Sequence, residues 1–153
     1  RRSRRPMRSP SSVPRMLRAE TKTRARALQL LYAWELQGGP PVRSVATGLA
    51  RITGERDTRL LERAEGLACE VVARASALDR HAAAAADNWR LSRIATVERN
   101  ILRLGIHELE GGAVPPKVAI DEAVRLAHWF AGPRAAGFVN GVLDRIAHSF
   151  GRL

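Results

Sequence analysis

Side chains that could bind a metal or act as a nucleophile are few in this sequence. Cys69 is its only cysteine, so the chain cannot form an internal disulfide or supply the thiolates of a cysteine-rich zinc site. Cys69 lies within a helical apolar pattern, which favours a core position over a nucleophile. The four histidines show no spacing typical of metal ligands; they are His81, His107, His128 and His148. We therefore expect no metal site and no thiol chemistry.

One pair of neighbouring acids, Asp121 and Glu122, could suggest acid–base catalysis. A helix would point the two carboxylates about 100° apart, and they follow Pro115-Pro116. We interpret them as first-turn acids that stabilise a helix N-terminus through its dipole. The sequence contains no glycine-rich phosphate loop and no nucleophile elbow. These observations predict a binding protein that needs no cofactor and is not an enzyme.

Positive charge is concentrated at the N-terminus. The 153 residues carry a net charge of +11, and residues 1–26 hold ten of the 26 Lys and Arg residues but one of the 15 acids. The remainder of the chain is therefore close to neutral. Such clustering is typical of nucleic-acid binders, with a membrane surface or a transit peptide as alternative explanations.

The first 15 residues differ in composition from the rest. They are rich in Arg, Ser and Pro and have hardly an apolar residue, which predicts a disordered basic extension at 1–15 followed by one helical domain at 16–153. The composition also suits an organellar transit peptide, although its prolines would break the amphipathic helix that such peptides use. We favour the N-terminal extension.

The rest of the chain predicts helices and no strand. Ala, Leu and Arg dominate, apolar residues recur at helical spacing, and Gly and Pro clusters separate the segments. The expected helices span about 18–37, 42–52, 57–86 with a break near 77–79, 92–109, 117–131 and 134–149. No apolar run approaches the roughly 20 residues of a membrane span. The single cysteine fits a reducing compartment, so we expect an all-α, cytoplasmic protein.

The first predicted helix carries a stripe of cations. Arg15, Arg18, Lys22 and Arg26 share one side of the helical wheel, and the residues opposite are apolar. Arg24 points towards the apolar side at the beginning of the helix. Phosphates favour such a stripe because binding releases counterions. The alternative is that this basic face is only solvated. The arginine-rich extension before it favours the nucleic-acid interpretation.

The stretch "GFVNGVLDRI" (137–146) contains Asn140-Gly141, a strong hairpin signal, within an apolar pattern of helical period. A hairpin would scatter the apolar residues, so we predict one continuous helix. Gly141 then lies on the polar side, where we expect it to let another backbone approach and Asn140 to bind a neighbouring loop. Phe138 could offer an aromatic face to an unstacked base or could pack as edge core.

Four segments together resemble the bacterial transcription antitermination factor NusB family. They occur in the family's order and at its approximate spacing; they are "RARALQLLYAWEL" (24–36), "RNILRLGIHELE" (99–110), "VPPKVAIDEAVRLAHWF" (114–130) and "FVNGVLDRI" (138–146). The resemblance covers about residues 18–148. It implies an all-α fold of about seven helices in two packed three-helix bundles that share a core.

The resemblance also implies a function. Members of this family bind boxA-type single-stranded RNA in ribosomal RNA leaders together with a small-subunit ribosomal protein that acts as NusE. They help transcription elongation complexes resist premature termination. The implied RNA-binding residues, with the stripe residue Arg18 and the loop residue Arg134 added, are Arg18, Lys22, Arg24, Arg26, Arg134 and Phe138.

The residues implied in NusE binding are Tyr32 and Glu98, and Leu102 lies one helical turn from Glu98. The helix at 92–109 is apolar over a wide arc, which we interpret as more apolar surface than a small bundle must bury. The sequence departs from the family before Phe138. The family tends to carry acidic and polar residues there, whereas this chain has Arg134 and small residues, which favours phosphate contact over base readout.

Two other functions remain open at this point. NusB-like domains also form the N-terminal part of certain ribosomal RNA cytosine methyltransferases, a reading that requires a protein extending beyond Leu153. Some family members instead form homodimers that cover the RNA and partner surfaces. Binding of a boxA-like RNA without the ribosomal protein would argue against a purely structural module.

Overall fold

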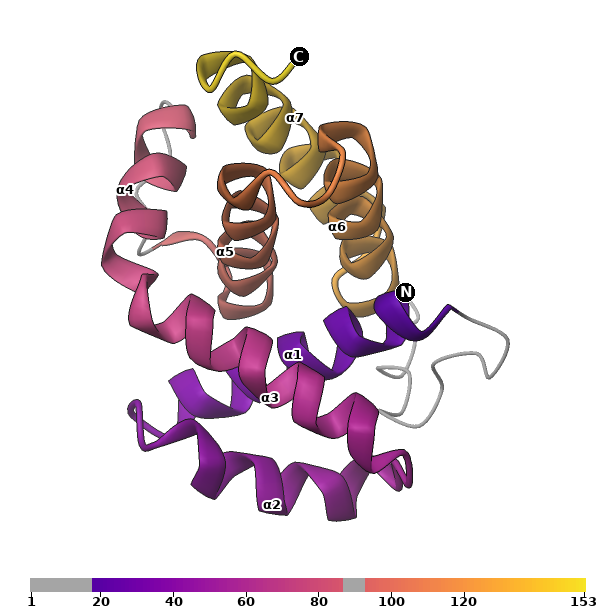
Figure 1. Ribbon diagram of the computed structural model, residues 1–153. Helices are drawn as coiled ribbons and strands as arrows, with labels where there is room; N and C mark the ends of the chain where they lie inside the picture. Colours follow the sequence, from indigo (N-terminus) through magenta and orange to yellow (C-terminus); the bar gives the residue numbers. More distant parts are fainter. Residues whose placement is uncertain (1–17, 87–92) are drawn as a thin grey trace, which may run out of the picture.

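The computed structural model describes residues 18–86 and 93–153, and this part of the chain forms seven α-helices and no strand (Figure 1). The helices are α1 (Ala19–Leu36), α2 (Val42–Thr53), α3 (Thr58–Ala73), α4 (Ala75–Ala85), α5 (Thr96–Gly111), α6 (Pro116–Phe130) and α7 (Pro133–Ser149). The prediction of an all-α fold is confirmed. The predicted extension at 1–15 lies outside the described residues.

Local sequence signals explain most helix ends. Gly54 and Gly112 end α2 and α5 in the left-handed conformation, with φ of 65° and 72°, which glycine adopts without steric cost. Pro116 and Pro133 occupy the first position of α6 and α7, where a missing N–H costs nothing. The side chain of Asp57 caps α3 by accepting a hydrogen bond from the Leu60 N–H.

Two predicted boundaries need correction. The break within 57–86 falls at Arg74, not near 77–79, because the chain turns there so that α4 packs against α5 and α7. The helix predicted from about 92 begins at Thr96.

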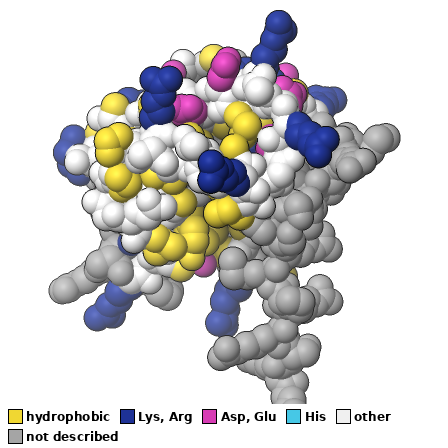
Figure 2. Space-filling model, turned by 90° about the horizontal axis from the view of Figure 1, so that it is seen from below, with side chains coloured by type: hydrophobic (Ala, Val, Ile, Leu, Met, Phe, Trp, Pro, Cys, Tyr) yellow, Lys and Arg dark blue, Asp and Glu magenta, His cyan; other side chains and the backbone are white. Residues whose placement is uncertain are grey.

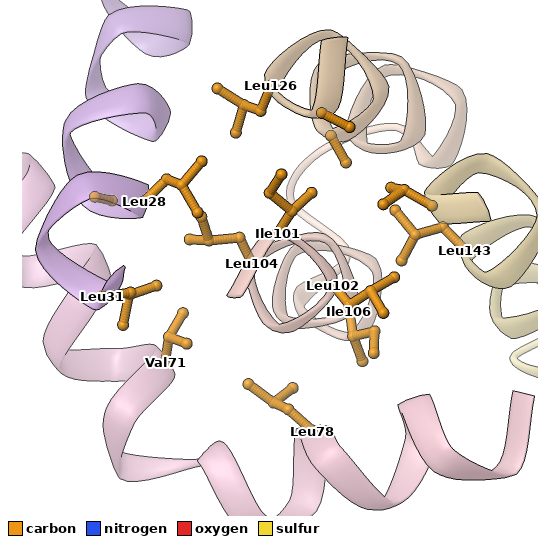
Figure 3. Close-up of a cluster of buried hydrophobic side chains, with 14 of the residues drawn as sticks. Leu28, Leu31, Val71, Leu78, Ile101, Leu102, Leu104, Ile106, Leu126 and Leu143 are labelled. Atoms are coloured by element: carbon orange, nitrogen blue, oxygen red, sulfur yellow. The ribbon is translucent and has the colours of Figure 1, made fainter. Parts of the chain in front are cut away.

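The helices form two groups that share α5 as a common centre (Figure 1). Helices α1, α2 and α3 make the first group, and α4, α6 and α7 surround α5 in the second. Figure 3 shows Leu28 of α1, Leu126 of α6 and Leu143 of α7 turned towards the side chains of α5. No described helix combines the length and the apolar character that crossing a membrane would require.

The central position of α5 corrects the interpretation of its apolar arc. Leu102, Ile106 and Leu109 are all 0% exposed, since α1, α4, α6 and α7 all pack against this helix. The arc is therefore buried within the molecule and does not provide a surface for a partner. The expectation that Leu102 contacts NusE is wrong in this structure, because its side chain reaches no surface.

The glycine that allows a close helix approach is Gly105, not Gly141. A Cβ at Gly105 would lie 2.7 Å from Leu143 Cδ1, so α5 and α7 meet closely at this point. A Cβ at Gly141 would meet nothing within 4 Å, and Asn140 is exposed. The predicted continuous helix is confirmed, but the roles expected of Asn140 and Gly141 within the molecule are wrong.

Two expectations about reactive side chains are also wrong. Cys69 is exposed and is not part of the core. Partial desolvation and the nearby Glu65 carboxylate raise the pKa of its thiol, which disfavours the reactive thiolate. Asp121 and Glu122 lie beyond the first turn of α6, which contains no acid, and Glu122 faces Arg24 of α1 instead.

Candidate nucleic-acid interface

The start of α1 presents two of the predicted RNA-binding cations to solvent. Arg18 immediately precedes the helix and is exposed, and Lys22, one turn later, is partly exposed. Within the described part of the chain, neither side chain makes an ion pair or a side-chain hydrogen bond. Both cations are therefore available to an anionic ligand.

Arg24 is held inside the molecule. Its Nε and Nη2 donate to the two carboxylate oxygens of Glu108 on α5 at 2.6 and 3.0 Å, and its Nη1 lies 3.7 Å from Glu122 on α6. Burial alone would lower the pKa of Arg24, but the hydrogen bonds and charge of Glu108 outweigh this and raise it. Arg24 thus fastens α1 to two other helices, and an RNA contact by this side chain would require it to leave Glu108.

Arg26 is also engaged internally. It is 5% exposed, its Nε donates to Glu55 Oε1 at 3.1 Å, and its Nη1 donates to Gln29 Oε1 at 3.0 Å. The turn between α2 and α3 brings Glu55 against this side of α1. The exposed part of the predicted cationic stripe therefore ends at Lys22, and an RNA contact by Arg26 would require its side chain to leave Glu55.

A second region combines cations with an aromatic side chain. A hollow of about 560 Å³ opens between the start of α5 and the junction of α6 and α7; its lining residues are Arg93, Ile94, Glu98, Ala131, Arg134, Ala135 and Phe138. Arg93 and Arg134 are exposed, and Phe138 is half-buried against the core. Two residues predicted for RNA thus line one hollow with Glu98, which was predicted for a protein partner.

Glu98 differs from the other acids near this end of α5. Within the described residues its carboxylate makes no ion pair or hydrogen bond, and partial burial raises its pKa. Glu35 on α1, in contrast, is paired with two arginines, and its pKa is lowered. Burial would raise its pKa, but hydrogen bonds from Arg99 at 2.6 Å and Arg103 at 2.8 Å lower it. Glu98 is therefore a partly desolvated carboxylate without an internal cation.

Tyr32 on α1 lies near the start of α5, the end of that helix that carries Glu98. It is half-buried on α1, one turn before Glu35, which binds Arg99 at the beginning of α5. Tyr32 and Glu98 therefore flank the contact between the end of α1 and the start of α5. Both are accessible to a partner, in contrast to Leu102.

The two candidate regions lie at opposite ends of α5. The start of α1 is fastened to Glu108, and the hollow contains Glu98, ten residues earlier on the same helix. At about 1.5 Å per residue, these positions are ~15 Å apart along the helix axis. A ligand that contacts both regions must be extended. Figure 2 shows Lys and Arg side chains dispersed over the face of the molecule that is seen from below, with hydrophobic side chains between them.

Sequence reasoning missed Arg93 as a member of the site. It is a single arginine just before α5, and no periodic pattern includes it. Only the approach of the α6–α7 junction to the start of α5 brings it beside Arg134 and Phe138. Among the described residues, no group of three or more His, Cys, Asp and Glu side chains is arranged to hold a metal.

Comparison with known proteins identifies the family. The sequence model of the NusB family matches residues 21–148. The transcription antitermination protein NusB of Sorangium cellulosum is 41% identical over 136 residues, which cover 88% of this chain and 96% of that protein. The NusB protein of an Anaeromyxobacter species is 37% identical over 83% of this chain and 88% of its own length.

A solved structure supports the same assignment. It is described as antitermination factors NusB and NusE in complex with dsRNA; the matched chain has a TM-score of 0.76 and 27% identity, with 88% of this chain and 99% of that chain covered. The sequence match spans most of this chain, and the helices superpose on a solved relative. The chain belongs to the NusB family.

Proposed function

We propose that this protein is an RNA-binding transcription antitermination factor that works with a ribosomal protein of the NusE type. The observation that carries the proposal is the match over most of the chain to relatives named as antitermination proteins. A structural relative solved with NusE and RNA supports both partners. The role is one of binding, in the cytoplasm, on nascent ribosomal RNA transcripts and their elongation complexes.

The RNA contacts that we propose come from two regions. Arg18 and Lys22 provide exposed cations at the start of α1, and Arg93, Arg134 and Phe138 provide cations and an aromatic ring at the hollow. Arginine and lysine side chains bind phosphates, and an aromatic ring stacks on an unpaired base. Because the regions are separated along α5, an extended single strand of boxA type fits them better than a compact ligand.

The protein contact that we propose uses Tyr32, Glu98 and the adjoining ends of α1 and α5. Tyr32 is partly exposed beside the ion pairs that join these helices, so a partner there would dock on a rigid support. A homodimer that covers the same surface is the alternative. Sedimentation of the purified protein with and without NusE separates these possibilities, because a homodimer would dissociate when NusE binds.

The proposal is tested by copurification with the NusE-type protein, followed by titration of a boxA-like RNA at two salt concentrations. Replacing both Arg18 and Lys22 with Ala should weaken RNA binding and reduce the slope of log K against log salt by about 1 to 1.5. A matched control replaces Arg43 and Arg80, two exposed arginines of α2 and α4, and should leave the slope unchanged. Failure of the unaltered protein to bind RNA would refute the proposal.

Single-stranded and double-stranded forms of the same sequence should be titrated side by side. The solved NusB–NusE relative is described with double-stranded RNA. We expect the single strand to bind more tightly, since Phe138 can stack only on a base that is free of its helix. Equal affinity for both forms would remove base stacking from the proposed mechanism.

A further inference from the structure

Three exposed arginines follow the end of α2, outside both regions of the proposed RNA site. Arg56 lies in the turn between α2 and α3, and Arg59 and Arg63 lie one helical turn apart in the first half of α3. We call these three residues the α2–α3 corner. Within the described part of the chain, none of them makes an ion pair or a side-chain hydrogen bond. Their guanidinium groups are therefore open to an anionic ligand.

The α2–α3 corner adjoins the start of α1. Glu55, the residue before Arg56, accepts a hydrogen bond from Nε of Arg26 on α1 at 3.1 Å. Arg63 lines a hollow of about 490 Å³ together with Arg24 and other residues at the start of α1. The corner therefore continues the surface that begins with the exposed cations of the proposed RNA site on α1.

The acids nearest to the corner in the sequence do not pair with its arginines. Glu55 is bound by Arg26, and the side chain of Asp57 accepts the hydrogen bond that caps α3. Glu62 and Glu65 line a different hollow, between α2 and α3. The fold thus leaves the corner with arginines that the neighbouring carboxylates do not occupy.

The position of Arg59 brings no benefit to the helix that carries it. Arg59 lies in the first turn of α3, where the helix dipole favours acids and disfavours cations, and that turn contains no acid. A residue that breaks a local rule without an internal contact in return indicates a functional position. We therefore interpret Arg59 as a residue that serves a ligand.

We propose that the α2–α3 corner binds the sugar–phosphate backbone of RNA that continues from the start of α1 beyond the boxA element. The inference rests on the proposed function and deepens it, because it extends the RNA path onto a further surface. Arg59 and Arg63 are four residues apart, which is about 6 Å along the helix axis and similar to the separation of neighbouring phosphates in an extended strand.

RNA fits the corner better than an acidic protein surface does, because the corner continues a surface that we already propose for RNA. Arginine side chains bind phosphates through paired hydrogen bonds as well as charge. The corner offers no aromatic ring on which a base could stack. We therefore expect it to hold the backbone without selecting a sequence.

The test compares RNA probes of two lengths with the full protein. The short probe is a boxA-like RNA of about 12 nucleotides, and two longer probes carry about 12 added uridines at the 5′ end or at the 3′ end. We expect one longer probe to bind more tightly than the short probe, with a salt slope larger by about 1.4, the contribution of two phosphate contacts on a single strand. The advantage of that probe should then fall about sevenfold between roughly 50 and 200 mM salt.

Variants of the corner should change only this advantage. Arg59→Ala combined with Arg63→Ala should remove it and leave binding of the short probe unchanged. Lysine at both positions should keep most of it, because lysine also binds phosphate through its charge. The matched control, Arg43→Ala combined with Arg80→Ala, removes two exposed arginines of α2 and α4 and should keep the full advantage. Thermal unfolding of the double alanine variant of the corner should be no lower than that of the unaltered protein, since both arginines are exposed.

The outcomes separate this inference from the proposed function. Equal binding of all three probes by the unaltered protein, or an advantage that survives the double alanine replacement, overturns the inference and leaves the proposed function intact. Equal weakening of the short and long probes would place the corner within the boxA site and would also overturn it. Weaker binding of the NusE-type protein with unchanged binding of long RNA would assign the corner to a protein partner instead. Absence of any RNA binding by the unaltered protein would overturn both proposals.

Discussion

The start of α1 and the hollow beside Phe138 both carry arginines, yet the surroundings of these arginines in the structure differ. At α1, Arg24 is bound to Glu108 and Arg26 to Glu55. At the hollow, Arg93 and Arg134 are exposed and lie beside an acid that they do not neutralise. The difference teaches that the availability of a cation depends on which carboxylates the fold places near it and not on the local charge of the sequence.

The physical basis of the difference is the cost of burying charge. A guanidinium removed from water must find a carboxylate and further hydrogen bonds, or the fold is destabilised. Arg24 and Arg26 meet this requirement within the protein. An exposed arginine such as Arg134 keeps its water and exchanges it for phosphate when RNA binds. The first group therefore supports the fold and the second is free to bind.

The largest expected effect comes from removing the partly buried cation that joins α1 to α5 and α6. Arg24→Ala would leave Glu108 and Glu122 half-buried without their cation, so we expect the free energy of unfolding to fall by about 3 kcal/mol. Arg134→Ala should change it by less than about 0.5 kcal/mol, because Arg134 is exposed. Urea unfolding of both variants measures the difference. Equal stability of the two would mean that Arg24 contributes as little as a surface residue.

The next effect tests the close contact between α5 and α7 at Gly105. Gly105→Ala would place a methyl group 2.7 Å from Leu143 Cδ1, so the buried Leu143 side chain or α7 itself would have to shift, at a cost of about 1–3 kcal/mol. Gly141→Ala lies in the same pair of helices but meets no neighbour, and should stabilise the protein by about 0.5–1 kcal/mol. Thermal unfolding should therefore shift in opposite directions. A stabilising Gly105→Ala would show that Leu143 and its neighbours accommodate the methyl group without cost.

For RNA binding we expect Lys22 to matter more than Arg24, although Arg24 matters more for stability. Lys22→Ala should weaken RNA binding and reduce the salt slope by about 0.7, the contribution of one phosphate contact on a single strand. Arg24→Ala, assayed at a temperature where it stays folded, should leave the slope unchanged. Titrations at two or more salt concentrations provide the measurement. A lower slope for Arg24→Ala than for Lys22→Ala would mean that Arg24 leaves Glu108 and reaches the RNA.

The smallest effect is the pH dependence of two acids. The arginines around Glu35 lower its pKa, so its stabilising contribution is present above the ordinary value of 4.5 and is lost as the pH falls through the lowered value. Glu35→Gln should therefore destabilise the protein at pH 7, by about 1 kcal/mol, and the difference should shrink at acidic pH.

The effect of Glu98 on stability should depend on pH with the opposite sign to that of Glu35. Its pKa is raised by burial, so its charge costs stability above the raised value, and the cost disappears as the pH falls through that value and 4.5. Glu98→Gln should be at least as stable as the unaltered protein at pH 7, with a difference that vanishes in acid. Unfolding curves recorded from pH 7 down to a pH below the lowered pKa of Glu35 test both signs. A destabilised Glu98→Gln would reveal an internal partner for this carboxylate.

Much of the fold could be predicted because its signals are local. Helical spacing of apolar residues, glycines at the ends of α2 and α5, and prolines at the starts of α6 and α7 all act within a few residues. The same local pattern predicted that α7 would run unbroken through Asn140-Gly141. The boundary at Arg74 was missed because the turn there serves the packing of α4 on distant helices.

The candidate site was predicted less well. Phe138, Arg134, Lys22 and Arg18 lie where a ligand can reach them, but Leu102 is buried at the centre of the molecule. An apolar arc on a helix can face a core or a partner, and the sequence alone cannot distinguish these environments. Because α5 is surrounded by four helices, its arc was mistaken for an interface.

The sequence by itself determined an all-α chain of the NusB family, since periodicity, helix caps and family motifs are properties of short segments. Only the tertiary structure decided which charges remain free. Arg24 meets Glu108 across 84 residues of sequence, and the hollow joins the start of α5 to the α6–α7 junction. Electrostatic pairing depends on distance in space, and that distance is established only when the helices pack.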